Sequence, residues 1–346
     1  MPFREEKEDQ FDPFEDLQYQ PAIKNMPRAK SGSKGKQRQA AVHKPQHEEL
    51  TLLAADQDET FNYTYQAGRL EAMWLYESLG YFHMMKWIDD ILRVVKGGKE
   101  ASVYLCKGNQ TTGADYIAAK VYRPRKFRQL KNDHLYREGR QDLDGQGNAI
   151  INKGLLHAIH KKTEFGRELL HTSWLEHEFQ TMQLLHTAGV DVPVPYASGN
   201  NAILMGYFGD EVMGAPTLND VDLDGAEARQ LFDRVIHNIE LMLAHNRVHG
   251  DLSAFNILYW DGEIVLIDFP QAIHPEINRS AFKIFQRDVV RVCEHFARQG
   301  IRSNPNKLAD DLWRKYNHNL TPQIDHKMLQ DDRDDERGLW ESLRNT

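Results

Sequence analysis

Three polar residues in the stretch VHGDLSAFN (248–256) have the types and the spacing that suit phosphoryl transfer. His249, Asp251 and Asn256 follow the pattern H-x-D-x-x-x-x-N. In a catalytic loop of that pattern, the aspartate orients or deprotonates an acceptor hydroxyl and the asparagine binds a metal ion. We therefore predict that Asp251 is the catalytic aspartate and that Asn256 is a metal ligand.

A second carboxylate, Asp268, ends the apolar run IVLIDFP (264–270), twelve residues after Asn256. The residues between them read as two short strands around a turn at Asp261–Gly262, which predicts a β-hairpin. The hairpin would bring Asn256 and Asp268 together as oxygen ligands, and Mg²⁺ takes one or two such ligands besides phosphate and water. Alone, Asp251 would suit a helix cap and Asp268 a turn; their joint spacing favours the catalytic interpretation.

Lys120 lies in YIAAKVY (116–122), which alternates like a half-buried strand. A lysine between Ala and Val needs a partner for its charge, and nucleotide phosphates with a helix glutamate would supply one. Glu178 is the favoured glutamate and Glu176 the alternative, because they lie on different faces of an expected helix over 174–187. The other interpretation is an edge-strand lysine whose ammonium reaches solvent.

The stretch KGGKEASVY (96–104) lies where a phosphate-covering loop would be expected, although it is not a G-x-G-x-x-G loop. We predict that backbone N–H groups and the Ser102 hydroxyl hold phosphate oxygens there. Gly98, Lys99 and Val103 are the other expected nucleotide contacts. An ordinary tight turn is the alternative.

Strands and helices in a definite order must position these residues. Periodicity predicts two short helices, or a helix and a turn, around Gly80 within 66–95. It then predicts strands and helices over the following segments: strands within 94–106, 116–122 and 202–210; helices over 174–187, 226–246 and 280–300; and a weaker helix over 308–316. This order predicts an α+β protein of two lobes with a cleft between them.

The composition narrows the class of protein. The chain has 346 residues, 40% of them hydrophobic, and a net charge of −8, which argues against binding nucleic acid over its whole surface. Cys106 and Cys293 are its only cysteines and form neither a disulfide framework nor a C-x-x-C metal site, which favours a reducing, cytoplasmic setting. We expect no secretory signal and no membrane span.

Both ends of the chain are expected to be polar arms. Residues 1–58 read as disordered, and the segment 28–44 holds six Lys or Arg and no acidic residue. That segment is either a solvated arm or a contact for RNA, a ribosomal particle or an acidic protein surface. Residues 301–346 read as a charged tail.

Four segments together resemble the RIO family of atypical serine/threonine protein kinases, of the bacterial type. They are GGKEASVY (97–104), AAKVY (118–122), WLEHEFQTMQLLHTAGVDVPVP (174–195) and VHGDLSAFNILYWDGEIVLIDFPQAI (248–273). The first and third are the specific ones, and the resemblance covers about 94–298. It implies a bilobal, protein-kinase-like fold with a small antiparallel sheet lobe (94–205) and a reduced helical lobe (209–300), preceded by a helical element (59–93).

The resemblance also implies ligands and roles. ATP would bind with Mg²⁺, or with Mn²⁺, and Lys120 would hold its phosphates while paired with Glu178. Met205 would lie behind the adenine, with Gly206 and Phe208 as the hinge. Asp251 would be catalytic, and Asn256 and Asp268 would bind metal; the family has also been proposed to form a phospho-aspartate at the position of Asp268, as an ATPase switch.

Some features depart from other protein kinases. DFPQ stands in place of D-F-G, as is normal in the family, and Gly250 stands where many kinases have an arginine that binds an activation-loop phosphate. Activity should therefore not depend on such a phosphate. The connection from Asp268 to the helix near Ser280 is short, so an extended peptide-docking lobe is not expected. The insert 123–172 is long and basic, and would be a recognition element or a mobile loop.

Two other functions remain open at this point. The HGDLxxxN and IDF motifs also occur in small-molecule kinases of the aminoglycoside- and choline-phosphotransferase type. A nucleotide-binding scaffold on ribonucleoprotein particles is the non-enzymatic alternative, since RIO relatives are linked to maturation of the small ribosomal subunit. The favoured prediction is a RIO-type serine/threonine kinase that phosphorylates a protein or itself, or acts as an ATPase.

Overall fold

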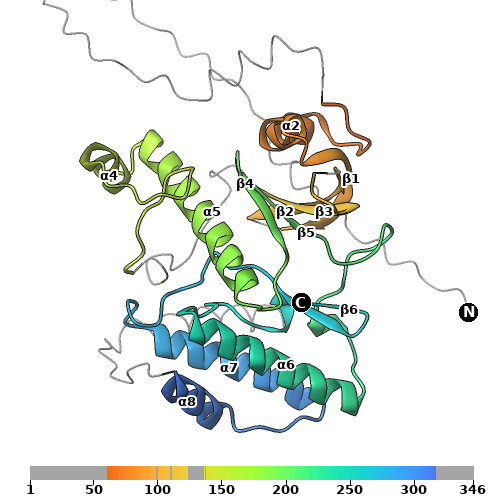
Figure 1. Cartoon of the computed structure of the whole chain (residues 1–346), viewed down its shortest axis with the longest axis vertical. Helices are drawn as coiled ribbons and strands as arrows, with labels where there is room; N and C mark the ends of the chain where they lie inside the picture. Colours follow the sequence, from red (N-terminus) through yellow and green to blue (C-terminus); the bar gives the residue numbers. More distant parts are fainter. Residues whose placement is uncertain (1–60, 99, 110, 124–135, 137, 317–346) are drawn as a thin grey trace, which may run out of the picture.

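The computed structural model describes residues 61–316, except 99, 110, 124–135 and 137. A sheet forms one lobe and a group of helices forms the other (Figure 1). This two-lobed α+β arrangement confirms the predicted fold class. The expected arm at 1–58, with its basic segment 28–44, and the chain from 317 onward lie outside the described residues.

The sheet of the N-terminal lobe has five strands in the order β1-β2-β3-β5-β4, and all neighbours are antiparallel. Lys120 lies on its central strand, so the interpretation as an edge-strand lysine is wrong. The strands are β1 (Ile88–Gly97), β2 (Ala101–Gly108), β3 (Tyr116–Tyr122), β4 (Pro195–Gly199) and β5 (Ala202–Gly206).

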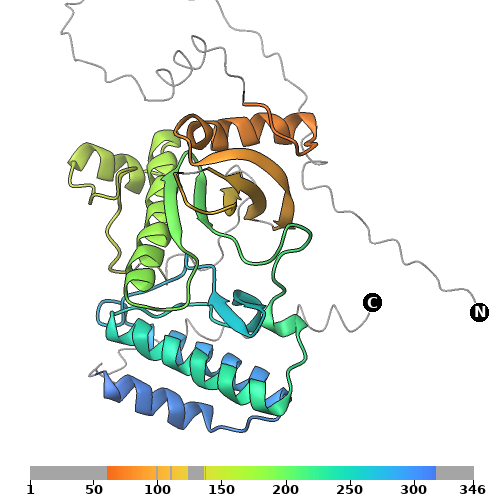
Figure 2. The ribbon, with the colours of Figure 1, turned by 45° about the vertical axis from the view of Figure 1, so that its right-hand side comes forward.

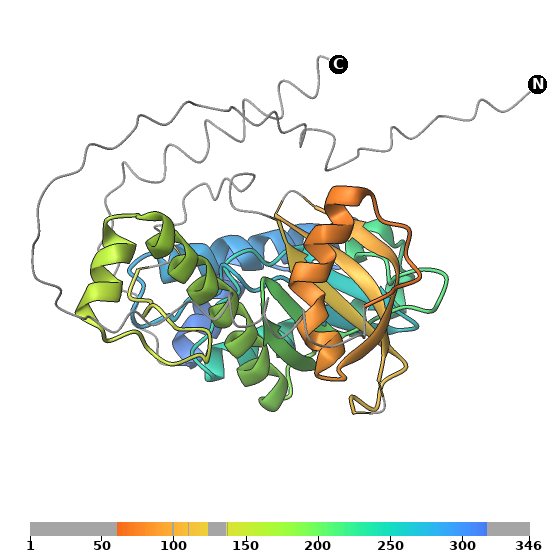
Figure 3. The same cartoon turned by 90° about the horizontal axis from the view of Figure 1, so that it is seen from above.

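Helix α2 (Arg69–Met84) lies across one face of this sheet (Figure 3). Its buried residues form a core with side chains from that face, including Tyr104 and Leu204. The helix runs without a break through Gly80, which corrects the expected pair of short helices. A glycine costs a helix only about 1 kcal/mol, less than a buried apolar face contributes, so packing keeps the helix whole. The expected helical element to residue 93 is also too long, because β1 begins at Ile88.

Two helices follow the connection after β3. They are α4 (Lys153–His160) and α5 (Glu164–Thr187), and α5 runs alongside β4 (Figure 1). The Thr163 hydroxyl caps α5 by accepting a hydrogen bond from the Gly166 N–H at 3.0 Å. The helix expected over 174–187 therefore begins ten residues earlier, inside the part of the chain that was interpreted as an insert.

The C-terminal lobe consists mainly of α6 (Gly225–Ala244), α7 (Ala281–Arg298) and α8 (Pro305–Lys315), which Figure 2 shows stacked below the sheet. Trp313 of α8 is 1% exposed and packs against Phe282 and Phe285 of α7. The lobe therefore extends past residue 300, and the expected charged tail begins too early. No helix among the described residues has the length and apolar character needed to cross a bilayer.

A hairpin of β6 (Ile257–Trp260) and β7 (Glu263–Leu266) lies between the lobes, as the sequence predicts. Asp261 and Gly262 form its turn with φ values of 49° and 81°. Two consecutive positive φ values are typical of the type I′ turn, whose twist suits a two-residue hairpin. The short 3₁₀ turn η4 (Ala254–Asn256) precedes β6 directly, so the hairpin connects Asn256 rigidly to the chain before Asp268.

Candidate active site

Lys120 contacts two carboxylates from distant parts of the chain. Its Nζ lies 2.6 Å from Glu178 Oε1 on α5 and 2.7 Å from Asp268 Oδ1 after β7. Burial acts to lower the pKa of Lys120, but the two carboxylates outweigh it and hold that pKa well above its usual value. An unpaired buried ammonium would cost several kcal/mol, so both carboxylates are needed to keep this lysine charged in the sheet.

The choice between the two glutamates of α5 is clear in the structure. Glu178 pairs with Lys120, and its second carboxylate oxygen accepts a hydrogen bond from the Tyr122 hydroxyl. Glu176 instead accepts a hydrogen bond from the Ser198 hydroxyl at 2.8 Å. Burial raises the pKa of Glu176 despite that bond. The expected Lys120–Glu178 ion pair is therefore present, and the Glu176 alternative is wrong.

Asp268 has a left-handed backbone with φ of 73°. This conformation costs a residue with a side chain about 1–2 kcal/mol, so the surrounding chain must hold it. Directly before it, the Ile267 N–H donates to the Asn256 carbonyl at 3.0 Å. Burial acts to raise the pKa of Asp268, but the attraction and hydrogen bond of Lys120 outweigh it and lower that pKa. Asp268 is thus an ionised oxygen donor beside Asn256.

Asp251 is held by two neighbours. Its Oδ1 accepts a hydrogen bond from Arg291 Nη1 at 2.9 Å, from helix α7. The Asn256 Nδ2 donates to the Asp251 carbonyl at 2.9 Å and to its Oδ2 at 3.3 Å. Both hydrogen bonds use the amide nitrogen and not the amide oxygen of Asn256, which agrees with the prediction that this oxygen is a metal ligand.

Beneath this loop, Gly250 is anchored to α7. The Gly250 N–H donates to Asp288 Oδ2 at 2.9 Å, and the Gly250 carbonyl accepts from Arg287 Nη2. Gly250 has φ of 85°, and a Cβ there would come within 2.1 Å of the Gln271 carbonyl oxygen. A side chain, arginine included, does not fit at this position. This is the physical reason for the glycine that the sequence shows before Asp251.

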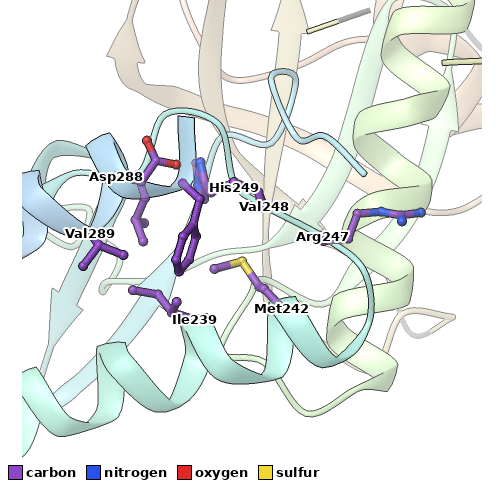
Figure 4. A pocket seen from close by; sticks show the side chains of 9 residues that line it. Ile239, Met242, Arg247, Val248, His249, Asp288 and Val289 are labelled. Carbon is purple, nitrogen blue, oxygen red and sulfur yellow. The ribbon is translucent and has the colours of Figure 1, made fainter. Parts of the chain in front are cut away.

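His249 supports the loop from inside. It is 2% exposed, its Nε2 lies 3.1 Å from the Ile267 carbonyl, and its ring packs on Phe269. Burial lowers the pKa of His249, so the ring is neutral at pH 7. Figure 4 shows His249 and Asp288 lining one small pocket together with apolar side chains from α6 and α7. His249 is therefore a structural residue beneath the site.

The expected phosphate loop agrees with the structure only in part. Val103 lies opposite Lys120 in the β2–β3 register, so the two side chains share a face of the sheet. Ser102 points to the opposite face, is 2% exposed, and makes a hydrogen bond with Tyr104. The prediction that its hydroxyl holds phosphate is therefore wrong.

Two other expected residues of this loop are Gly98 and Lys99. A Cβ at Gly98 would lie 2.8 Å from the Ala101 carbonyl oxygen, so this close approach of the main chain requires glycine. Lys99 lies outside the described residues.

The expected hinge residues follow β5. Met205 pairs with Ala118 and packs against the core between the lobes. The Gly206 N–H donates to the Val194 carbonyl at 2.8 Å, and the Phe208 carbonyl accepts from the Ala215 N–H at 2.9 Å. The N–H of Gly206 is thus engaged within the protein. That Gly206 and Phe208 offer hinge backbone groups to a nucleotide base stays a prediction.

Several site residues were missed by sequence reasoning, namely Tyr122, Arg140, Arg287, Asp288 and Arg291. Asp288 could have been found, because it lies at helical spacing among the buried apolar residues of α7. A carboxylate on an apolar face is a signal for a buried anchor. Arg291 is one turn further along and had no comparable signal.

Comparisons with known proteins identify relatives. The model of the RIO domain family matches residues 102–308. Serine/threonine-protein kinase RIO1 of Chaetomium thermophilum is 31% identical over 226 residues, covering 62% of this chain but only 40% of that protein. RIO-type serine/threonine-protein kinase Rio1 of Thermoplasma acidophilum is 32% identical over 142 residues, 41% of this chain and 73% of that protein. A solved Rio2 kinase–ADP/Mg²⁺–phosphoaspartate complex from Chaetomium thermophilum is 19% identical with a TM-score of 0.45, over 86% of this chain and 85% of that one.

Proposed function

We propose, from the premise that this chain belongs to the RIO family of protein kinases, that it transfers the terminal phosphoryl group of ATP to a serine or threonine hydroxyl. The observation that carries the proposal is the position of Lys120 Nζ between Glu178 and Asp268, at 2.6 and 2.7 Å. It brings a fixed cation next to a metal-binding carboxylate where the two lobes meet. Phosphoryl transfer requires little more from a protein than such positioning and charge.

The donor set supports Mg²⁺ as the metal. The described residues contain no cluster of three His, Cys, Asp or Glu side chains that could hold a metal alone. Asn256 and Asp268 instead offer two oxygens from adjoining loops, and Mg²⁺ is bound by one or two protein oxygens together with nucleotide phosphates and water. When bound, the metal would neutralise charge on the transferred group. Mn²⁺ would use the same two oxygens.

Each residue then has a task. Lys120 holds the nucleotide phosphates and is itself oriented by Glu178. The Phe208 N–H faces the base edge, and Met205 lies behind it. Asp251, held by Arg291, orients the acceptor hydroxyl and takes its proton. These roles are inferred from the positions of the residues.

The decisive experiment locates the phosphate. The protein is incubated with γ-labelled ATP and Mg²⁺, and mass spectrometry identifies the labelled side chain in the wild type, Asp251→Asn and Asp268→Asn. We expect label on Ser or Thr that is lost in Asp251→Asn. Label on Asp268 or on water alone would instead indicate an ATPase switch. In a parallel incubation with an aminoglycoside or choline added, label on that small molecule, with none on protein, would refute the proposal in favour of a small-molecule kinase.

A ribonucleoprotein partner is the finer part of the proposal. Residues 28–44 carry the basic charge that motivates contact with RNA or a ribosomal particle, in a cytoplasmic setting. Binding that weakens steeply with salt, and that is lost on deletion of 28–44, would support this contact. Unchanged binding after the deletion would remove it.

A further inference from the structure

Described residues shortly before 141 contact the C-terminal lobe. Three of their side chains, those of Tyr136, Glu138 and Arg140, reach loops or helices of the C-terminal lobe. Arg140 Nη2 donates to the Ala272 carbonyl at 2.7 Å and to the Pro270 carbonyl at 3.1 Å. We call the residues 136 and 138–140 the strap.

The other strap contacts lie around the same loop. The Tyr136 hydroxyl lies 3.2 Å from Arg287 Nη1, and Arg287 in turn donates to the Gly250 carbonyl of the catalytic loop. Glu138 makes an exposed ion pair with Arg279 at 3.4 Å. Exposed pairs contribute little, whereas hydrogen bonds from a charged donor to buried carbonyls contribute more. Arg140 is therefore the strap residue with the strongest hold on the loop.

The strap fits closely against the loop that it holds. Gly139 has φ of 74°, and a Cβ there would lie 1.9 Å from Ile277 Cγ2. Only glycine satisfies both the backbone conformation and the contact. Gly139 thus lets the main chain come close enough for the adjacent Arg140 to reach the carbonyls of Pro270 and Ala272.

These contacts restrain the backbone next to Asp268. Its left-handed backbone needs restraint on both sides. On the near side, Ile267 is tied to Asn256 by a backbone hydrogen bond. On the far side, the loop after Asp268 is held by the Arg140 guanidinium, at positions two and four residues further on.

We propose that Arg140 is a positioning residue for the metal-binding carboxylate of Asp268, acting through the carbonyls of Pro270 and Ala272. This inference rests on the proposed function, since it assigns Asp268 to the metal. Arg140 also comes from the segment that joins the sheet lobe to α5. It supplies a permanent cation for the loop after Asp268 in a chain that has glycine, not arginine, directly before Asp251. The loop is held in place without phosphorylation.

The test compares Arg140→Ala and Arg140→Lys with a matched control, Arg279→Ala. The control removes the side chain of an arginine outside the strap that makes an exposed ion pair with Glu138, a contact expected to contribute little. Two quantities are measured: the affinity for ADP by calorimetry with Mg²⁺ and with EDTA, and kcat and KM for ATP. The ratio of the two ADP affinities reports metal binding without any need for turnover.

We expect Arg140→Ala to reduce the gain in ADP affinity from Mg²⁺ and to reduce kcat, each by about tenfold or more, as for other groups that orient a metal ligand. ADP affinity in EDTA and KM for ATP should stay within about twofold, and Arg140→Lys should recover part of the loss because one ammonium can still donate to carbonyls. Arg279→Ala should match the wild type.

The failure of this inference is distinct from failure of the proposed function. If Arg140→Ala keeps the full Mg²⁺-dependent gain in ADP affinity, the positioning role is refuted. If the alanine variant does not fold, Arg140→Met decides, because it keeps much of the side chain but has no donor for the two carbonyls: wild-type values for the methionine variant in both measurements also refute it. If the wild type binds Mg·ADP but transfers no phosphate to protein, the proposed function fails while the ADP measurement still tests Arg140.

Discussion

The ammonium of Lys120 lies 2.7 Å from the carboxylate of Asp268, although 148 positions separate them in the sequence. Lys120 belongs to the central strand of the sheet lobe, and Asp268 follows the hairpin between the lobes. Their contact therefore joins the two lobes at the candidate site. Glu178 binds the same ammonium from α5, so the position of this helix, the charge of the lysine and the position of the Asp268 carboxylate depend on one another.

The first prediction separates the two glutamates of α5. Glu178→Gln weakens a charge-assisted contact to Lys120, and such contacts contribute about 1.5–3 kcal/mol, so we expect kcat/KM for ATP to fall about 10- to 100-fold. Glu176→Gln is the matched control, because Glu176 is also buried but bonds Ser198. Steady-state kinetics of both variants measure this difference. Equal losses in the two variants would contradict the assignment of Glu178.

The second prediction concerns Arg291, which holds Asp251 at 2.9 Å. Arg291→Ala should lower kcat about tenfold or more, because it removes a charged hydrogen bond that orients the catalytic carboxylate. KM for ATP should change little, since Arg291 contacts Asp251, which is proposed to act on the acceptor hydroxyl and not on the nucleotide. Arg298→Ala, an exposed arginine of the same helix, is the control. A change confined to KM would show that Arg291 acts on nucleotide binding instead.

The sequence predicted the site better than the elements around it. Short motifs contain Lys120, Asp251, Asn256 and Asp268, and the spacing of these motifs predicts a hairpin and a catalytic loop. Such local patterns can be predicted because they depend on residues that are close together in the sequence. The orientation of Ser102 could not be predicted from the sequence, because a shift of one residue in strand register reverses the face of every side chain. The start of α5 at Glu164 was missed because the helix is polar at that end and is stabilised by its cap and by α4.

Contacts made across the fold were likewise beyond sequence reasoning. Arg140 lies in a polar stretch and Arg291 among the apolar residues of α7, and their partners are main-chain carbonyls and a carboxylate far away in the chain. α8 was undervalued for the same reason. Its charges indicate a tail, whereas Ala309, Leu312 and Trp313 are buried against the rest of the lobe.

The third prediction uses two glycines to separate strain from collision. Gly262 and Gly250 have similar φ values, 81° and 85°, but a Cβ at Gly262 meets open space while one at Gly250 meets the Gln271 carbonyl. Gly262→Ala should lower the free energy of unfolding by about 1–2 kcal/mol, the cost of the left-handed backbone. Gly250→Ala should cost clearly more and should also reduce kcat, because the neighbouring Asp251 must move. Urea unfolding measures both, and equal losses of stability would contradict the packing described here.

The fourth prediction is a pH dependence of stability that arises from Asp288. Burial raises the pKa of this carboxyl to about 6, against 3.8 for an ordinary aspartate, and Arg287 opposes the rise only in part. Between these two values the folded protein keeps a proton that the unfolded chain has released. The free energy of unfolding should therefore fall as pH rises through this window, by about 3 kcal/mol in all.

Two other groups at the site act in the opposite direction. The pKa values of His249 and Asp268 are lowered by folding, so their contributions to stability are lost as pH falls. Comparison of the wild type with Asp288→Asn removes these shared effects, because the variant keeps both groups and keeps an acceptor for the Gly250 N–H. Loss of the partner of Arg287 shifts the stability of the variant by a constant, since an arginine stays charged throughout this range. The difference in unfolding free energy between the two proteins should thus change by about 3 kcal/mol between about pH 4 and about pH 7. Urea titrations of both proteins measure this difference, and Asp261→Asn, which changes an exposed aspartate, is the control. If the pH profiles of the wild type and Asp288→Asn are parallel, burial beneath the catalytic loop does not raise the pKa of Asp288, and the prediction is contradicted.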